Sequence, residues 1–527
     1  MTADKTYDAV IIGAGHNGLA CAIHLAKRGW RVGVFEAKSV AGGAVKTSEV
    51  TLPGFRHDLF AMNLSMFAGS PFLKEHGEAL MKHGLAFVPA EDCFASVFPD
   101  DSYFGVSKTL ERTLDRLRAL SGKDAEAWSQ MLQTFGGEAP HIFGLLGNPM
   151  PSWAAAKVVW SAWRQKGTSW VLEMMRFLMS SPRNWLNANF ENTKVKATLA
   201  AWGMHLDFAP DIAGGALFPY LESMANQAFG MVIGKGGADT MIKAMTSYLK
   251  ELGGDLHLGT PVQEIIKEQG WADGILLANG ERIRAQKAVI ANVTPAVLFN
   301  TLLPNGSGKT EVDRKFRAFR PGPGTMMLHL ALDKPLRWTA SEDLSGFAYV
   351  HIAPSFDYMT AAYTQAMDGH LPERPVLVVG QPTAIDPSRA PDGKHITWVQ
   401  VRVLPKHVKG DAAGQIKGSN WADIKEAYAE RVIDVIERYA PGARASIIGR
   451  AVFSPDDLEA ENPCLIGGDN LSGSHHLDQN FLFRPVAGYS RYKMPIDRLY
   501  MCGAATWPGA GTGAGSGYLL GKMLGGK

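Results

Sequence analysis

Tyr7–Gly18 reads YDAVIIGAGHNG, and this stretch decides the fold. Its first half is a short apolar run typical of a buried strand in a parallel sheet. Its second half has the spacing GxGxxG, in which Gly13 allows a tight turn, Gly15 lets a diphosphate approach the backbone and Gly18 lets a helix pack closely on the strand. Residues 19–28 predict that helix, whose free N–H groups and positive dipole end would face the phosphates. The stretch therefore predicts a dinucleotide-binding βαβ unit.

An acidic residue and a second glycine turn follow this unit. Residues 31–35 predict a second strand, and Glu36 comes 18 residues after Gly18, where a carboxylate accepts hydrogen bonds from ribose hydroxyls and disfavours the 2′-phosphate of NADP. The glycine turn at 42–43 suits a cofactor whose diphosphate and ribityl chain continue past the first strand, which favours FAD over NAD. The cofactor-binding residues predicted in this half of the site are Gly13, Ala14, Gly15, His16, Asn17, Gly18, Glu36, Ala37, Gly42, Gly43 and Ala44.

The composition is that of a globular protein with several domains. The chain has 527 residues, of which 46% are hydrophobic and 20% charged. A net charge of +2 and scattered arginines argue against a nucleic-acid surface. The cysteines lie far apart, so neither a local redox pair nor a metal site is expected; they are Cys21, Cys93, Cys464 and Cys502.

The N-terminal residues predict a cytoplasmic location. A strand begins by about residue 7, and no charged region, apolar region and cleavage site precede it. Residues 139–156 are uncharged but contain three prolines and two glycines, so we interpret them as a loop and not as a membrane span.

The order of patterns along the chain predicts an α/β protein with a Rossmann-type FAD-binding domain assembled from discontinuous segments. Strand and helix patterns return after residue 230, with a hairpin turn at Asn279-Gly280 and separate short strands at 281–283 and 288–292. Alternating runs between 310 and 405, among them residues 376–380, predict a mixed or antiparallel sheet that faces substrate, and residues 421–439 predict an amphipathic helix. We predict an FAD-binding domain at 1–75, 225–305 and 445–527, a substrate-binding domain at 76–104 and 306–444, and a helical insert or lid at 105–224.

The helical insert has an unusual composition. Seven of the thirteen tryptophans lie between residues 128 and 202. Trp153, Trp160 and Trp163 fall close to one helical face, interleaved with Lys157, Arg164 and Lys166. Core packing of a helical subdomain is the commoner use of such a stripe. The alternative is a lid whose apolar face lines a substrate cavity or enters a bilayer surface.

The C-terminal segment carries the second glycine-rich signal. Residues 499–503 predict a buried strand, and residues 504–517 are a glycine-rich loop before a final helix. This order also suits an anion at a helix N-terminus. No strand and acid follow, so we expect the loop to close the flavin site from the other end of the chain, with contacts from Gly503, Pro508 and Gly513.

These motifs resemble the flavoproteins of the phytoene desaturase and carotenoid isomerase type, within the amine-oxidase-like superfamily. The likeness extends nearly end to end and includes residues 53–58 and the segment 236–238, after which the backbone of Val262 is implied to meet the adenine. Residues 478–485, DQNFLFRP, and the C-terminal loop are similar to the branch named for a pyridine-nucleotide-disulfide-oxidoreductase domain. Without a cysteine pair, disulfide chemistry is not expected here.

The C-terminal loop departs from the family pattern, in which a histidine precedes Pro-Gly-Gly-Gly-Val. Here Trp507 precedes Pro508, which implies an indole beside the isoalloxazine where substrate lies. Trp507 and Arg484 are therefore the predicted substrate-facing residues. Arg484 would bind a substrate carboxylate or the flavin, with a buried ion pair as the alternative.

The resemblance implies an FAD-dependent oxidoreductase that desaturates an apolar small molecule, such as a polyene, isoprenoid or cyclic compound, by hydride transfer to flavin N5. His57, His205 and Asp207 are the candidate proton acceptors. The alternatives are a flavin amine oxidase, a carotenoid-type isomerase and a non-catalytic flavoprotein at a membrane. The sequence leaves open whether oxygen or a quinone reoxidises the flavin, whether the chain is a homo-oligomer, and whether it is peripheral to the inner membrane.

Overall fold

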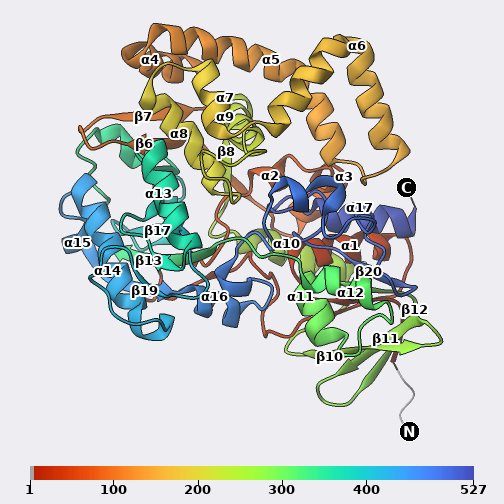
Figure 1. Ribbon diagram of the computed structural model, residues 1–527. Helices are drawn as coiled ribbons and strands as arrows, with labels where there is room; N and C mark the ends of the chain where they lie inside the picture. Colours follow the sequence, from red (N-terminus) through yellow and green to blue (C-terminus); the bar gives the residue numbers. More distant parts are fainter. Residues whose placement is uncertain (1–4, 527) are drawn as a thin grey trace.

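The computed structural model describes residues 5–526. Two large sheets form the frame: in Figure 1 the first lies at the lower right, the second lies on the left, and a group of helices lies at the top of the view. No helix among the residues 5–526 is long and apolar enough to cross a membrane.

The first sheet contains the dinucleotide-binding unit. Its seven strands follow the order β10-β11-β12-β1-β2-β9, with β20 also paired to β12. β1 is parallel to both β12 and β2, because the chain crosses over through helices between them. The bounds are β1 Lys5–Ile12, β2 Val32–Phe35, β9 Asp255–His257, β10 Val262–Glu268, β11 Trp271–Leu277, β12 Arg282–Ala291 and β20 Leu499–Met501.

One expectation for this sheet is corrected. The sequence predicts separate strands at 281–283 and 288–292, but β12 is continuous. Its first residues pair with β11, and its last three, 289–291, pair with β20 on the same edge. No glycine or proline interrupts residues 281–291, so nothing in the backbone ends the strand.

Four helices pack beside this sheet on the right of Figure 1. α1 is buried along most of its length, since it consists largely of small and aliphatic residues. α3 begins with Pro71 after Ser70, whose side chain accepts a hydrogen bond from the Leu73 N–H. The bounds are α1 His16–Lys27, α3 Pro71–Lys82, α10 Asp239–Glu251 and α17 Gly515–Gly525.

The second sheet is mixed, with the order β19-β13-β17-β16-β14-β6-β7. β14 is parallel to β6, and the other neighbours are antiparallel. Helices α13 (Phe356–Met367), α14 (Trp421–Tyr439) and α15 (Ala443–Ser446) lie with this sheet on the left of Figure 1. The strand bounds are β6 Asp92–Val97, β7 Tyr103–Ser107, β13 Gly324–Leu332, β14 Tyr349–Ile352, β16 Val376–Gly380, β17 His395–Leu404 and β19 Ile447–Phe453.

Two segments lie outside their predicted regions. β19 pairs with β13 in the second sheet, although the sequence predicts 445–527 in the FAD-binding domain. β5 (Phe87–Ala90) pairs with β8 (Met231–Gly234), and α3 packs with α1 and α10, although the sequence predicts 76–104 in the substrate-binding domain. Strand edges and apolar helix faces find partners in space, which sequence order does not specify.

The helical region contains α4 Leu110–Leu120, α5 Gly122–Leu146, α6 Trp153–Met179, α7 Pro182–Asn189, α8 Thr193–Met204 and α9 Leu217–Phe229. The predicted loop at 139–156 is wrong in part, because α5 continues through Pro140 to Leu146 and α6 begins at Trp153. Proline has no backbone N–H, so the helix loses one backbone hydrogen bond at Pro140. Because Pro140 is exposed, this loss falls on the solvent side of the helix. Gly167, with φ 84° and ψ 173°, divides α6 into two helices.

Core packing explains only some of the tryptophans in this region. Trp128 and Trp202 are buried, as that interpretation requires. By contrast, Trp153 is 86% exposed, Trp160 59% and Trp163 38%. The first half of α6 therefore presents its aromatic stripe to the outside.

Candidate cofactor and active site

The first glycine loop and α1 form the base of the site. Gly15 is the N-cap of α1, and the first turn contains no acidic residue that would oppose a phosphate. A Cβ on Gly18 would lie 2.4 Å from the Gly13 oxygen, so helix and strand meet at a distance that only glycine permits. The Asn292 amide at the end of β12 donates to that same oxygen at 3.3 Å, which links the loop to the sheet.

Glu36 lies beside this loop. One of its carboxylate oxygens accepts from the Ala14 N–H at 2.8 Å and the other from the Lys38 N–H at 2.9 Å. The side chain is half-buried, and a carboxylate retains further lone pairs for ribose hydroxyls. The Thr260 N–H donates to the Glu36 carbonyl at 2.8 Å, which brings the start of β10, with Val262, to this end of the sheet.

The second glycine turn lies directly against the first. Gly15 and Gly42 form a parallel β-bridge, and the Gly42 N–H donates to the Ala14 oxygen at 3.0 Å. A Cβ on Gly42 would lie 2.3 Å from the Val45 oxygen. Ala44 follows in the same turn, whereas the side chain of Ala37 is exposed. Adjacent loops with glycine at each close approach leave backbone free for a diphosphate.

The C-terminal loop reaches the same place. The Nε2 atom of His16 lies 3.2 Å from the Gly511 oxygen, and the Gly517 N–H donates to the Asn17 side chain at 3.1 Å. A Cβ on Gly517 would lie only 1.7 Å from the backbone carbonyl oxygen of Asn17. Burial lowers the pKa of His16 to about 4, so its imidazole is neutral at pH 7.

The other predicted residues of this loop surround the junction. Gly503 lies next to the Asn292 side chain, with 3.0 Å between its would-be Cβ and that oxygen. The would-be Cβ of Gly513 lies 3.4 Å from the Met66 oxygen, and the Pro508 ring lies against Gly515. The structure thus brings together glycine segments from both ends of the chain.

Trp507 is directed toward the helical region. Its side chain is 2% exposed and its indole N–H donates to the Asn148 oxygen, 2.9 Å away in the α5–α6 connection. Its ring packs against Phe481 with centroids 6.0 Å apart. These contacts give Trp507 a clear role in fixing the C-terminal loop to the insert.

Arg484 is fully buried, and backbone carbonyls surround its guanidinium. It donates to Ala504 at 2.9 Å and to Ser474 at 2.9 Å, and more weakly to neighbouring carbonyls of the 471–473 turn. Burial lowers its pKa to about 9. Arg484 therefore positions two loops by hydrogen bonds to carbonyls, an arrangement different from the predicted substrate contact and from the ion pair considered as its alternative.

The three candidate proton acceptors do not form one group. His57 lies apart from the other two, with Nε2 2.8 Å from the Thr51 hydroxyl and its ring edge-on to His329. His205 and His351 meet through their Nε2 atoms at 3.1 Å. Burial lowers the pKa of His57 to about 3 and that of His205 well below its usual range.

Asp207 lies near His205 in sequence and is held in a hydrogen-bond network. Its carboxylate accepts from the Tyr363 hydroxyl at 2.8 Å and from the Ser474 hydroxyl at 2.5 Å, and it lies 3.4 Å from the His476 Nε2 atom. Burial raises its pKa. The hydrogen bonds from Tyr363 and Ser474 offset this rise only in part, and they occupy both carboxylate oxygens, so Asp207 is tied to its neighbours in the network.

Glu222 on α9 is the acidic group that sequence reasoning missed. Burial alone raises the pKa of its carboxyl to about 7, and no described residue forms a hydrogen bond or ion pair with that carboxyl. The residue nevertheless keeps some accessible surface. The sequence did contain a signal for this residue: Glu222 is the only charged residue between Asp211 and Lys235, and an isolated charge in an apolar stretch is a candidate functional group.

The helix face that carries Glu222 points toward the C-terminal loop. Phe218 lies one turn earlier on that face, and its ring centroid is 6.5 Å from that of His475. His475 in turn accepts from the Ala510 N–H at 3.0 Å. The charge of Glu222 also acts on Tyr349, whose ring stacks on Trp398 at 5.7 Å. The helix α9 thus approaches the C-terminal loop through Phe218 and His475, and the charge of Glu222 acts on an aromatic pair of the second sheet.

The comparisons with known proteins agree with this geometry. A family model described as flavin-containing amine oxidoreductase matches residues 18–518. The chain belongs to this family. Its cofactor is FAD and it is an FAD-dependent oxidoreductase, which confirms the predicted cofactor and enzyme class. The loops at 13–18, 42–43 and 503–517 lie close together with glycine at their contacts, and this arrangement fits a bound dinucleotide such as FAD.

Several curated relatives cover nearly the whole chain. Pyridine nucleotide-disulfide oxidoreductase domain-containing protein 2 of Rattus norvegicus is 26% identical, over 96% of this chain and 91% of that protein. One subunit of the limonene dehydrogenase of Castellaniella defragrans is 25% identical, over 99% and 95%. The neurosporene-forming phytoene desaturase of Cereibacter sphaeroides is 25% identical, over 98% and 94%. The predicted family resemblance is confirmed.

Solved structures share the fold. An oxidoreductase from Methanosarcina mazei matches with a TM-score of 0.61 at 18% identity, covering 98% of this chain and 99% of that one. Cyclohexylamine oxidase from Brevibacterium oxydans matches with a TM-score of 0.56 at 15% identity, covering 99% of each. At these identities the likeness supports the α/β flavoprotein architecture alone.

Proposed function

We propose that this oxidoreductase desaturates an apolar small molecule, with Glu222 accepting the proton. The observation that carries the proposal is the unpartnered carboxyl of Glu222, whose charge acts on Tyr349, a ring that stacks on Trp398. Aromatic surfaces bind apolar ligands, and a carboxyl with a pKa near 7 is suited to general base catalysis. The names of relatives, among them a limonene dehydrogenase and phytoene desaturases, support the same substrate class.

FAD, when bound, supplies the acceptor for the hydride. We assign the diphosphate to the α1 N-terminus and the turn at 42–43, and the adenosine ribose to Glu36, with Val262 nearby. We assign the flavin end to the loop at 503–513. The protein's own part is to position the substrate between that loop and α9, to exclude water with aromatic side chains, and to accept the proton at the Glu222 carboxylate.

A flavin amine oxidase is the second candidate. The carboxylate of Glu222 has no cationic partner among the described residues, so it would also attract a substrate ammonium group. The two candidates differ in the chemistry of the substrate and share the same site.

An anaerobic titration separates them. The oxidised flavin absorption of the purified protein is followed during addition of alkenes, polyenes, cyclic ketones and amines in turn. Bleaching by an apolar alkene, polyene or ketone is the expected result. Bleaching by amines alone would favour the oxidase. A flavin band that no compound bleaches would contradict both and shift support to isomerisation or a non-catalytic role.

We also propose that α6 places the enzyme on an anionic bilayer surface. The exposed stripe of Trp153, Trp160 and Trp163 is interleaved with Lys157, Arg164 and Lys166, a combination that suits an interface between acyl chains and anionic headgroups. An apolar substrate dissolved in that bilayer would then be close to the helical region that carries Glu222.

A further inference from the structure

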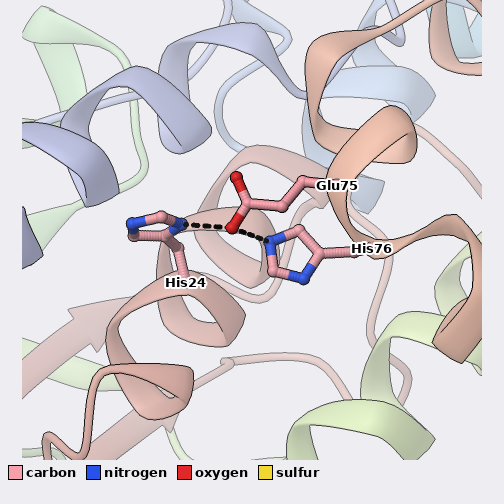
Figure 2. A group of neighbouring side chains, drawn as sticks. All are labelled: His24, Glu75 and His76. Carbon is pink, nitrogen blue, oxygen red and sulfur yellow. Dashed lines mark ion pairs between the residues drawn. The ribbon is translucent and has the colours of Figure 1, made fainter. Parts of the chain in front are cut away.

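We propose that His24, Glu75 and His76 form a binding site for one divalent transition-metal ion of the zinc class. His24 lies on α1 and the other two residues on α3, and Figure 2 shows both imidazoles directed at the same carboxylate oxygen. The sequence analysis expected no metal site, because it searched for ligands at local spacing. These three residues come together only through the packing of α1 on α3 and α17.

Three of the four ring nitrogens of His24 and His76 lack hydrogen-bond partners among the described residues. His24 is 0% exposed and His76 1% exposed. The Nδ1 atom of His24 and both ring nitrogens of His76 form no hydrogen bond within the described part of the chain. Buried polar atoms are nearly always paired, since an unpaired one costs about 1–3 kcal/mol. A bound cation would satisfy two of these three nitrogens at once.

The surrounding hydrogen bonds orient the proposed ligands. The Nε2 atom of His24 lies 3.2 Å from the Gly526 carbonyl; donation to this oxygen leaves the lone pair on Nδ1, the atom that faces Glu75. The Tyr518 hydroxyl donates to one oxygen of Glu75 at 2.5 Å and leaves the other toward the imidazoles. Histidine ligands of metal sites are usually fixed by such a bond from the second nitrogen.

The distances between the ligand atoms are close to those of a metal centre. The free oxygen of Glu75 lies 3.8 Å from the His24 Nδ1 atom and 3.6 Å from the His76 Nε2 atom. Ligands about 2.0–2.1 Å from a tetrahedral ion stand about 3.3 Å from one another, so the two distances to Glu75 need to shorten by about 0.5 Å or less, and all the ligand atoms already lie within 4.8 Å of one another. Glu75 is 29% exposed, which leaves a path for a water as fourth ligand.

The chemistry of the ligand set selects the metal. Two imidazoles and one carboxylate suit zinc and its neighbours, whereas calcium and magnesium prefer oxygen ligands only. The charges of Lys27, Arg28 and Lys522 act on the same cluster and reduce the affinity for a cation.

The role of the site would be structural. It joins α1 to α3 and, through Tyr518 and Gly526, to both ends of α17, so an ion here would fix the helix that follows the first glycine loop. A ligand that binds only the folded state raises its stability by mass action. This inference is independent of the substrate proposed above.

Cobalt titration of untagged, chelator-stripped holoprotein tests the site. Co²⁺ in a tetrahedral nitrogen and oxygen site gives visible absorption at wavelengths longer than the oxidised flavin bands. We expect saturation at one ion per chain, displacement by Zn²⁺, and a higher Tm with Zn²⁺. Absence of both the absorption and the Tm shift at a large excess of metal would overturn the proposal.

Variants locate the ion. E75Q keeps an oxygen acceptor for Tyr518 but loses the charge, and we expect it to weaken Co²⁺ binding at least about tenfold while flavin content stays normal. H76N removes one ligand and is expected to abolish the absorption. H83Q is the matched control, because His83 and Glu251 pair at 2.7 Å at the end of α3 without a third ligand. Equal Co²⁺ affinity in E75Q and H83Q would contradict the site.

Discussion

The glycine loops of the cofactor site and the helices of the insert use the same residue type in opposite ways. At Gly18 and Gly517 a Cβ would lie 2.4 Å and 1.7 Å from a backbone oxygen. At Gly136 in α5 and Gly167 in α6 a Cβ would meet nothing within 4 Å. Around the cofactor, backbone segments from both ends of the chain touch, so side chains are excluded. At these two positions of the insert there is room for a side chain, so glycine is not required by packing.

Substitution of glycine by alanine gives the largest expected contrast. G517A forces apart Asn17 and the start of α17, so we expect loss of bound FAD and a fall in Tm. G136A, in an exposed helix interior, is expected to raise stability by about 1 kcal/mol because it lowers the entropy of the unfolded chain. Flavin content and thermal unfolding of both variants measure the contrast. Normal flavin content in G517A would contradict the close approach.

Ion pairs give a second contrast. Arg389 and Asp58 pair at 2.5 Å with side chains 0% and 1% exposed. R389M leaves Asp58 buried without its partner and is expected to cost about 3–5 kcal/mol of unfolding free energy. Lys123 and Glu191 in the insert pair at 2.7 Å but are 74% and 61% exposed, so K123M should leave the Tm unchanged. Equal Tm changes in the two variants would remove this distinction.

Removal of the Glu222 carboxyl separates catalysis from stability. We expect E222Q to reduce the rate of flavin reduction about 10²–10⁴-fold and to abolish the rise of that rate with pH near 7. The raised folded-state pKa means that ionisation destabilises the fold as the pH rises from 4.5 to about 7. E222Q should therefore be more stable than the wild type at pH 8 and equally stable at pH 4.

Stopped-flow reduction with the substrate found in the titration, together with unfolding curves at both pH values, provides the measurement. The conservative variant E222D retains a carboxyl and is expected to recover part of the rate. A pH profile that E222Q leaves unchanged would exclude Glu222 as the proton acceptor.

The smallest expected effect concerns α6. The double variant W160S/W163S removes two exposed indoles and is expected to lower co-flotation with anionic vesicles several-fold, with unchanged flavin content. I448S is the matched control, since Ile448 is 43% exposed on β19, on the other side of the molecule in Figure 1. Equal flotation of all three proteins, or equal recovery without vesicles, would contradict membrane contact through α6.

Local signals were sufficient for the cofactor half of the molecule. The spacing of Gly13, Gly15 and Gly18, the position of Glu36 and the glycine-rich C-terminus predicted both the first sheet and FAD, because a tight turn and a close backbone approach restrict each position to few residue types. Strand and helix bounds such as β16 at 376–380 and α14 at 421–439 follow from periodicity. The predicted domain boundary between residues 444 and 445 was wrong, because β19 pairs with the edge of β13 in the second sheet, and sequence order does not specify that pairing.

The sequence by itself determined the family, the cofactor and the order of the glycine loops, since these depend on residues close together in the chain. Only the tertiary structure decided which polar groups are unpartnered. Glu222, and the group of His24, Glu75 and His76, became candidates because packing removes water and supplies no hydrogen bond to part of each. The same packing assigned Arg484 and Trp507 to loop positioning, since their partners lie in segments that no local pattern relates to them.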